Sequence, residues 1–155
     1  MQSVSRSIAN IASAAAYRAV AAAVAQGDAR GVAVVAAVVD TGGHLMACLR
    51  GDGAFIASID IARDKAWTGA VFGLSTDTLC AALSHKESLR EGIALRPGVV
   101  LFSGGLPILE SGAVIGGIGV SGGSEDDDRI CAQAGLAAIG LGPQDKDNNF
   151  CPAEP

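Results

Sequence analysis

The stretch FSGGLPILESGAVIGGIGVSGGSEDDD, residues 102–128, decides the fold of this chain. It predicts a hairpin that turns at Glu110-Ser111-Gly112, then a glycine-rich corner and the start of an acidic helix. Strands joined by hairpins form an antiparallel sheet. Residues 117–122 match the pattern G-x-G-x-x-G, but a dinucleotide site needs a strand–helix–strand unit, and four carboxylates stand where its pyrophosphate would bind. We therefore expect these glycines to let the strand lie against a ligand or another backbone.

The rest of the chain predicts helices around this hairpin, from apolar periodicity and from glycine and proline breaks. The expected helices are 5–27, 55–72, 75–83, 84–92 and 124–141, and the expected strands are 32–40, 44–50, 99–102, 106–109 and 113–120. This order predicts an α+β fold with a five-stranded antiparallel sheet flanked by helices. We expect residues 1–142 to form one domain and residues 143–155 to form a flexible tail.

Composition narrows the class of protein. The chain has 155 residues, 50% hydrophobic and 17% charged, which is enough for one domain with a core. A net charge of -5 without a basic stripe argues against nucleic-acid binding, and no apolar run is typical of a membrane helix. Cys48, Cys80, Cys131 and Cys151 are far apart without a CxxC pair. Their spacing predicts reduced thiols and a cytoplasmic location.

Charged residues supply the candidate catalytic groups. Lys65 lies among apolar residues, where a lysine is an ion-pair partner, an anion-binding group or an amine with a lowered pKa. Acids in the first turn of a helix are stabilised by its free N–H groups, each by about 0.3–1 kcal/mol. Within the run 125–128, Glu125, Asp126 and Asp128 are the candidates for a general base, and one acid is free to pair with Lys65 or Arg129.

Three further residues are candidates for binding. His44 and His85 are the two histidines, and either ring is able to ligate haem iron, although such distant residues make a weak metal signature. Tyr17 is another residue type that ligates haem iron. Arg50 flanks the first hairpin, where turn chemistry and salt bridges are the ordinary roles; we include it as a ligand-binding candidate.

Several motifs occur together in one order and spacing: VVDTGGHL (38–45), LRGDGAF (49–55), IARDKAW (61–67), FSGGLPI (102–108) and GAVIGGIGVSGGSEDDD (112–128). In these motifs, over about residues 5–141, the chain resembles the GlcG/HbpS-like family. That family includes haem-binding proteins and the C-terminal domain of corrinoid adenosyltransferases of propanediol utilisation, to which the DKAW segment is most similar. The resemblance does not extend to a catalytic adenosyltransferase domain. It implies a profilin-like sheet, homo-oligomers such as tetramers or octamers, and haem or a related tetrapyrrole as ligand.

The resemblance also marks pocket candidates. Those in matching motifs are Lys65, Gly104, Gly105, Pro107, Gly119, Ser121 and Gly122. Haem-binding members of the family carry an iron-ligating histidine on or near the first helix, and the first helix expected here has none. This departure gives weight to a ligand other than haem.

Three hypotheses follow, and the sequence leaves open whether the protein is an enzyme. The leading one is a cytoplasmic protein that binds haem or a related tetrapyrrole in a pocket. The second is a catabolic isomerase, hydratase or deaminase acting on a small unsaturated hydroxy or amino carboxylic acid, with Lys65 holding the carboxylate and an acid of 125–128 moving protons. The third is an accessory interaction protein whose glycine-rich wall is purely structural.

Overall fold

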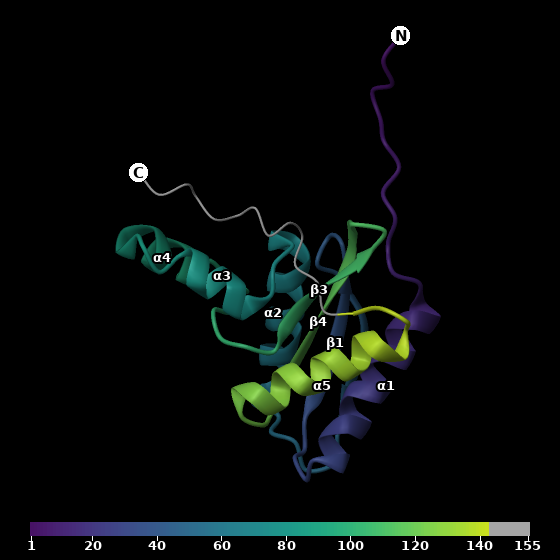
Figure 1. Cartoon of the computed structure of the whole chain (residues 1–155), viewed down its shortest axis with the longest axis vertical. Coiled ribbons are helices and arrows are strands. Elements are labelled where there is room, and N and C mark those ends of the chain that lie inside the picture. The colour runs from purple at the N-terminus through teal and green to yellow at the C-terminus, as the bar shows by residue number, and fades with distance from the viewer. Residues whose placement is uncertain (143–155) are drawn as a thin grey trace.

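The structure of the chain is a computed structural model, and it describes residues 1–142 (Figure 1). The predicted tail, 143–155, lies outside the described residues. The elements, in order, are α1 (Ser13–Ala29), β1 (Val35–Asp40), β2 (Leu45–Arg50), α2 (Ala57–Phe72), α3 (Thr76–Ala82), α4 (Glu87–Ala94), β3 (Gly105–Glu110), β4 (Ala113–Ser121) and α5 (Glu125–Ala138). The predicted α+β class is confirmed. Among the described residues, no helix is both long and apolar enough to cross a membrane.

The four strands form one antiparallel sheet in the order β2-β1-β4-β3. Helices α1 and α5 lie side by side on one face, α2 lies on the other, and α3 and α4 extend to one side (Figure 1). The central strand β1 is buried along its length because it has helices on both faces. Ala36 and Val38 pack towards α1 and α5, and the alternate residues Val35 and Val39 pack towards α2.

Glycines in β4 let helix α2 lie directly on the sheet. A Cβ atom built on Gly117 would collide with the carbonyl oxygen of Ala66, and one built on Gly119 would collide with that of Ala62. The expectation that these glycines meet another backbone is confirmed, and that backbone belongs to α2. The antiparallel pairing of β4 with both its neighbours also excludes the dinucleotide-binding unit.

The predicted fifth strand, 99–102, does not form. Its backbone donors find partners outside any strand: the N–H of Val100 donates to Oγ1 of Thr68 at 3.0 Å, and that of Val99 donates to the carbonyl of Arg96 in a turn. The sheet of the described residues therefore has four strands instead of five.

Two predicted helix starts are wrong. The first helix begins at Ser13 instead of residue 5, because the N–H of Ile11 donates to the carbonyl of Ile115 and Asn10 Oδ1 accepts from Thr41. The helix predicted from Ser84 begins at Glu87, since the Ser84 hydroxyl donates to the carbonyl of Ala81 and does not cap. Both segments satisfy their polar groups through neighbours that periodicity does not reveal.

Candidate functional site

Lys65 and Asp128 form a buried ion pair that joins α2 to α5. Nζ of Lys65 donates to Oδ2 of Asp128 at 2.8 Å and to the carbonyl of Val120 at 2.9 Å. The ammonium also lies 4.9 Å from the centre of the Phe102 ring. The two side chains are only 1% and 5% exposed. Lys65 therefore pairs with an acid of 125–128, which is one of the alternatives that the sequence left open, and two of its three ammonium hydrogens are donated to protein oxygens.

Burial opposes the charge of both partners. It lowers the pKa of Lys65 and raises the pKa of Asp128, and the hydrogen bond between them counteracts burial in each case. A backbone N–H, that of Gly123, also donates to Asp128 Oδ1 at 2.9 Å. These contacts indicate a structural pair, because a ligand carboxylate would have to displace Asp128 to reach the amine.

The other acids of the run have separate roles. Glu125 Oε1 accepts from the N–H of Ser103 at 2.9 Å and so holds the segment before β3. Asp127 shares a capping box with Ser124. Its pKa is lowered first by the hydrogen bond from Arg30 and then by Ser124. Asp126 is 79% exposed and pairs with Arg129. The structure does not bring Glu125, Asp126 and Asp128 together around one open position.

The predicted glycine wall is packed against protein. Gly104 has φ 117°, and a Cβ there would lie 2.7 Å from Lys65 Nζ. Gly122, with φ 138°, lies against the carbonyl of Ala33. The remaining members are Gly105, whose N–H donates to Thr76, the fully buried Pro107, Gly119 against α2, and Ser121, whose hydroxyl donates to Ser58. Their assignment as ligand-binding residues stays a prediction.

His44 is an exposed imidazole held by a carboxylate. It lies in the β1–β2 turn with its side chain 81% exposed, and Nδ1 is 3.2 Å and 3.3 Å from the two oxygens of Asp40. Burial alone would raise the pKa of Asp40, but hydrogen bonds from the N–H groups of His44 and Gly42 lower it. Within residues 1–142, Nε2 forms no hydrogen bond. The Asp40 carboxylate therefore fixes Nδ1 as the donor and leaves Nε2 open as an acceptor.

The remaining candidates are dispersed. His85 is exposed between α3 and α4, and Arg50 is exposed at the end of the edge strand β2. Tyr17 is 69% exposed on α1. The described residues contain no group of three or more His, Cys, Asp or Glu side chains able to hold a metal ion. The two histidines lie on different connections, β1–β2 and α3–α4, and neither belongs to such a group.

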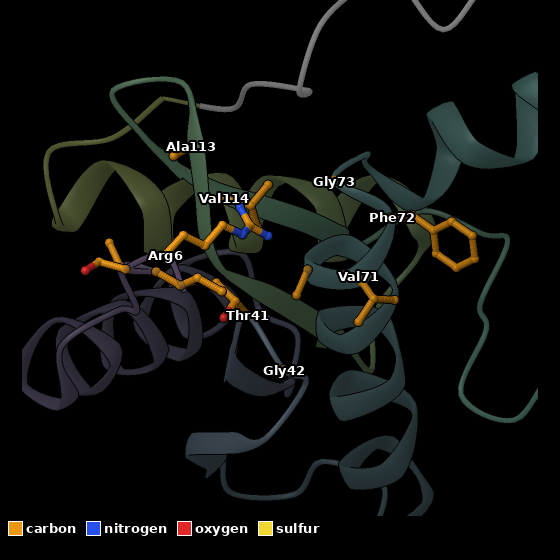
Figure 2. Close-up of a pocket in the computed structure, with 12 residues that line it drawn as sticks. Arg6, Thr41, Gly42, Val71, Phe72, Gly73, Ala113 and Val114 are labelled. Atoms are coloured by element: carbon orange, nitrogen blue, oxygen red, sulfur yellow. The ribbon is translucent and has the colours of Figure 1, made fainter. Parts of the chain in front are cut away.

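The structure also contains an open groove of about 530 Å³. It lies between the segment 6–9, the β1–β2 turn, the C-terminal end of α2 and the start of β4 (Figure 2). Its lining residues are Arg6, Ser7, Ile8, Ala9, Thr41, Gly42, Ala70, Val71, Phe72, Gly73, Ala113 and Val114. These residues come from four separate parts of the chain and share no motif. No signal in the sequence marks them as neighbours.

A family model described as "Haem degrading protein HbpS-like" matches residues 11–137. The chain belongs to this HbpS-like family. Among curated relatives, the "Uncharacterized 15.0 kDa protein in dhaT-dhaS intergenic region" of Citrobacter freundii is 40% identical over 107 residues, which are 68% of this chain and 75% of that protein. The corrinoid adenosyltransferase PduO of Salmonella typhimurium is 37% identical over 72% of this chain, but the match covers only 33% of PduO.

Solved structures of the family have the same fold. Klebsiella pneumoniae protein ORFY is 33% identical with a TM-score of 0.84, covering 90% of this chain and 97% of that one. HbpS is 34% identical with a TM-score of 0.79, covering 86% and 93%. PduOC in complex with haem is 30% identical with a TM-score of 0.78, covering 87% and 99%.

Proposed function

We propose that this protein binds haem or a closely related tetrapyrrole. The observation that carries the proposal is the likeness to PduOC, which was solved with haem and resembles 87% of this chain at 30% identity. Membership of the HbpS-like family supports the same ligand class. The family resemblance puts an iron-ligating histidine on or near the first helix, and α1 has none, so the proposal requires an iron ligand outside α1.

His44 is the residue that fits the iron best. A histidine that ligates a metal commonly donates its other ring N–H to a carboxylate, which fixes the tautomer and the orientation of the ring. Asp40 does this for His44, whose Nε2 faces no protein partner among the described residues. His85 is exposed but has no such carboxylate partner in the described structure. Bound haem would supply an iron centre, and His44 would be the residue that holds the iron and tunes its properties.

The proposal is for binding instead of acid–base turnover. Lys65 is 1% exposed and already holds Asp128, so it is not available for the carboxylate of a small substrate. Asp126 points to solvent, and Glu125 holds the backbone of Ser103. The geometry therefore does not favour the isomerase, hydratase or deaminase hypothesis.

The test is a titration of the purified apo-protein with haemin, followed at the Soret band. We expect a saturable shift in the wild type and a changed ligation spectrum with weaker binding in His44→Ala. Asp40→Asn should weaken binding by about tenfold, since partners of a ligating histidine typically contribute 10- to 100-fold to affinity. His85→Ala is the matched control and should titrate like the wild type.

Two outcomes would contradict this reading. A non-saturating Soret change in the wild type would remove haem as the ligand. Normal ligation in His44→Ala together with its loss in His85→Ala or Tyr17→Phe would keep the ligand and reassign the iron to the other residue.

A cytoplasmic location is part of the proposal. Among the described residues Cys48, Cys80 and Cys131 are free thiols, and Cys48 is exposed. Burial raises the pKa of the Cys131 thiol to about 11, which keeps it protonated and unreactive. An exposed free thiol such as Cys48 fits a reducing compartment.

A further inference from the structure

The groove described above carries charge of one sign. Arg6 is the single charged side chain among its lining residues, and the apolar side chains of Ile8, Val71 and Val114 line the groove together with polar atoms. In Figure 2 the Arg6 side chain extends across the groove towards Val114. Within residues 1–142, Arg6 forms no salt bridge with an acidic side chain. The groove therefore offers a cation without a partner to an apolar ligand that bears an anion.

The polar groups of the β1–β2 turn beside Arg6 are already engaged. Both the N–H and Oγ1 of Thr41 donate to Asn10 Oδ1, at 2.9 Å and 2.7 Å. The N–H of Gly42 donates to Asp40 Oδ1 at 2.9 Å. These bonds fix the β1–β2 turn as a rigid wall, so among these groups the guanidinium of Arg6 is the one left to bind an anion.

The groove adjoins the proposed iron ligand. Gly42 belongs to the lining, and a Cβ atom built on it would lie 2.8 Å from Cε1 of the His44 ring. A side chain at position 42 would therefore displace that ring. The glycine lets the oriented imidazole lie directly against the rim of the groove.

We propose that this groove takes the edge of the tetrapyrrole and that Arg6 pairs with one of its carboxylate side chains. The inference rests on the proposed function and assigns the place on the protein where the ligand binds. A porphyrin is flat and mostly apolar and, in haem, bears two propionates, which matches a groove that combines apolar side chains with polar atoms and one unpaired arginine. Pockets for ligands of this size typically measure about 300–1,000 Å³, and the groove, at about 530 Å³, lies in that range.

The test separates the groove from the iron by using metal-free protoporphyrin IX, which has the carboxylates but no metal. Binding is followed by porphyrin fluorescence. We expect Arg6→Ala to raise Kd by about three- to tenfold, as for loss of one partly exposed charged pair, and Arg6→Lys to recover part of the affinity. Arg90→Ala is the matched control, an exposed arginine on α4 without a salt bridge in the described structure. It should bind like the wild type.

Two further arms test the carboxylate and the groove itself. Protoporphyrin IX dimethyl ester has no free carboxylate, so its Kd should be the same for the wild type and Arg6→Ala. Ala113→Phe places a ring in the groove without changing any charge, and it should weaken both porphyrins. Circular dichroism spectra like the wild type would show that each variant is folded.

The outcomes distinguish this inference from the proposed function. In one outcome haemin binding is saturable, but neither Arg6→Ala nor Ala113→Phe changes the affinity for protoporphyrin IX. The groove would then not be the binding site, and the proposal of haem binding would stand. Haemin binding without any protoporphyrin IX binding would also overturn it, since the iron alone would then hold the ligand. Failure of the wild type to bind either compound would overturn both.

Discussion

Lys65 has the largest side chain among the fully buried residues that the structure describes. Removing an ammonium and a carboxylate from water costs several kcal/mol each, which only good geometry and further hydrogen bonds offset. Both conditions are met, because Lys65 and Asp128 contact each other at 2.8 Å and each has another hydrogen bond to the backbone. The pair therefore fixes how α5 sits relative to α2 at the ends of β3 and β4.

We predict that Lys65→Met destabilises the fold by about 3–5 kcal/mol, because it leaves the Asp128 carboxylate buried without a cation. The measurement is urea unfolding followed by circular dichroism. Lys86→Met is the matched control, since Lys86 is exposed, and it should change the unfolding free energy by less than about 0.5 kcal/mol.

The double variant Lys65→Met/Asp128→Leu sharpens this test. It removes both charges, so it should be more stable than Lys65→Met alone. Equal destabilisation by Lys65→Met and Lys86→Met would show that the pair contributes little, and the structural role assigned to it would be wrong.

At the scale of single elements, the sequence predicted those helix ends that depend on the chemistry of neighbouring residues. Gly73 ends α2 in the left-handed region at φ 69°, and Ser124 starts α5 with a capping box. The misplaced start at residue 5 and the absent strand 99–102 depend instead on contacts with distant residues, and the misplaced start at Ser84 on a hydrogen bond to Ala81 in the preceding helix. The same limit applies to the site: rare residue types pointed to His44 and Lys65, whereas the groove around Arg6 assembles from segments that no motif connects.

Helix α2 can approach β4 only because β4 is rich in glycine, and this makes a prediction about Gly119. A Cβ there would collide with the carbonyl of Ala62 and lie 2.8 Å from Cβ of Lys65. We expect Gly119→Ala to destabilise the protein by at least about 1–3 kcal/mol in urea unfolding, as overpacking of a core does.

Gly92→Ala is the control for that experiment. Gly92 lies inside the exposed helix α4, and a Cβ there would meet no atom within 4 Å of the described structure. The substitution should stabilise the protein by about 0.5–1 kcal/mol through helix propensity. A Gly119→Ala protein as stable as the wild type would mean that α2 does not rest on the backbone of β4.

At the scale of the whole molecule, the strand β2 is an edge with an apolar, exposed stretch. It ends the sheet order β2-β1-β4-β3, and Leu45, Met46 and Leu49 on it are 52%, 36% and 41% exposed. Edge strands are usually protected by charges, prolines or bulges, and here the protection is limited to Arg50 at the end of β2 and an irregularity in its pairing with β1 at Val38/Val39, while residues 45–49 have neither a charge nor a proline. A second copy of the same strand fits this edge, because antiparallel pairing about a two-fold axis makes the surface its own complement.

We therefore predict that the protein forms homo-oligomers in which β2 pairs with β2 of a second copy, and that Leu49→Lys reduces the assembly to units of half the mass. The substitution would bring two lysines together across the two-fold axis, where their charges repel each other. It would also remove the apolar contact between the two copies of Leu49. Light scattering coupled to size-exclusion chromatography measures this directly. Leu95→Lys, at an 85% exposed position after α4, is the matched control and should keep the wild-type mass. A monomeric wild type, or a Leu49→Lys protein of unchanged mass, would show that copies do not meet at β2.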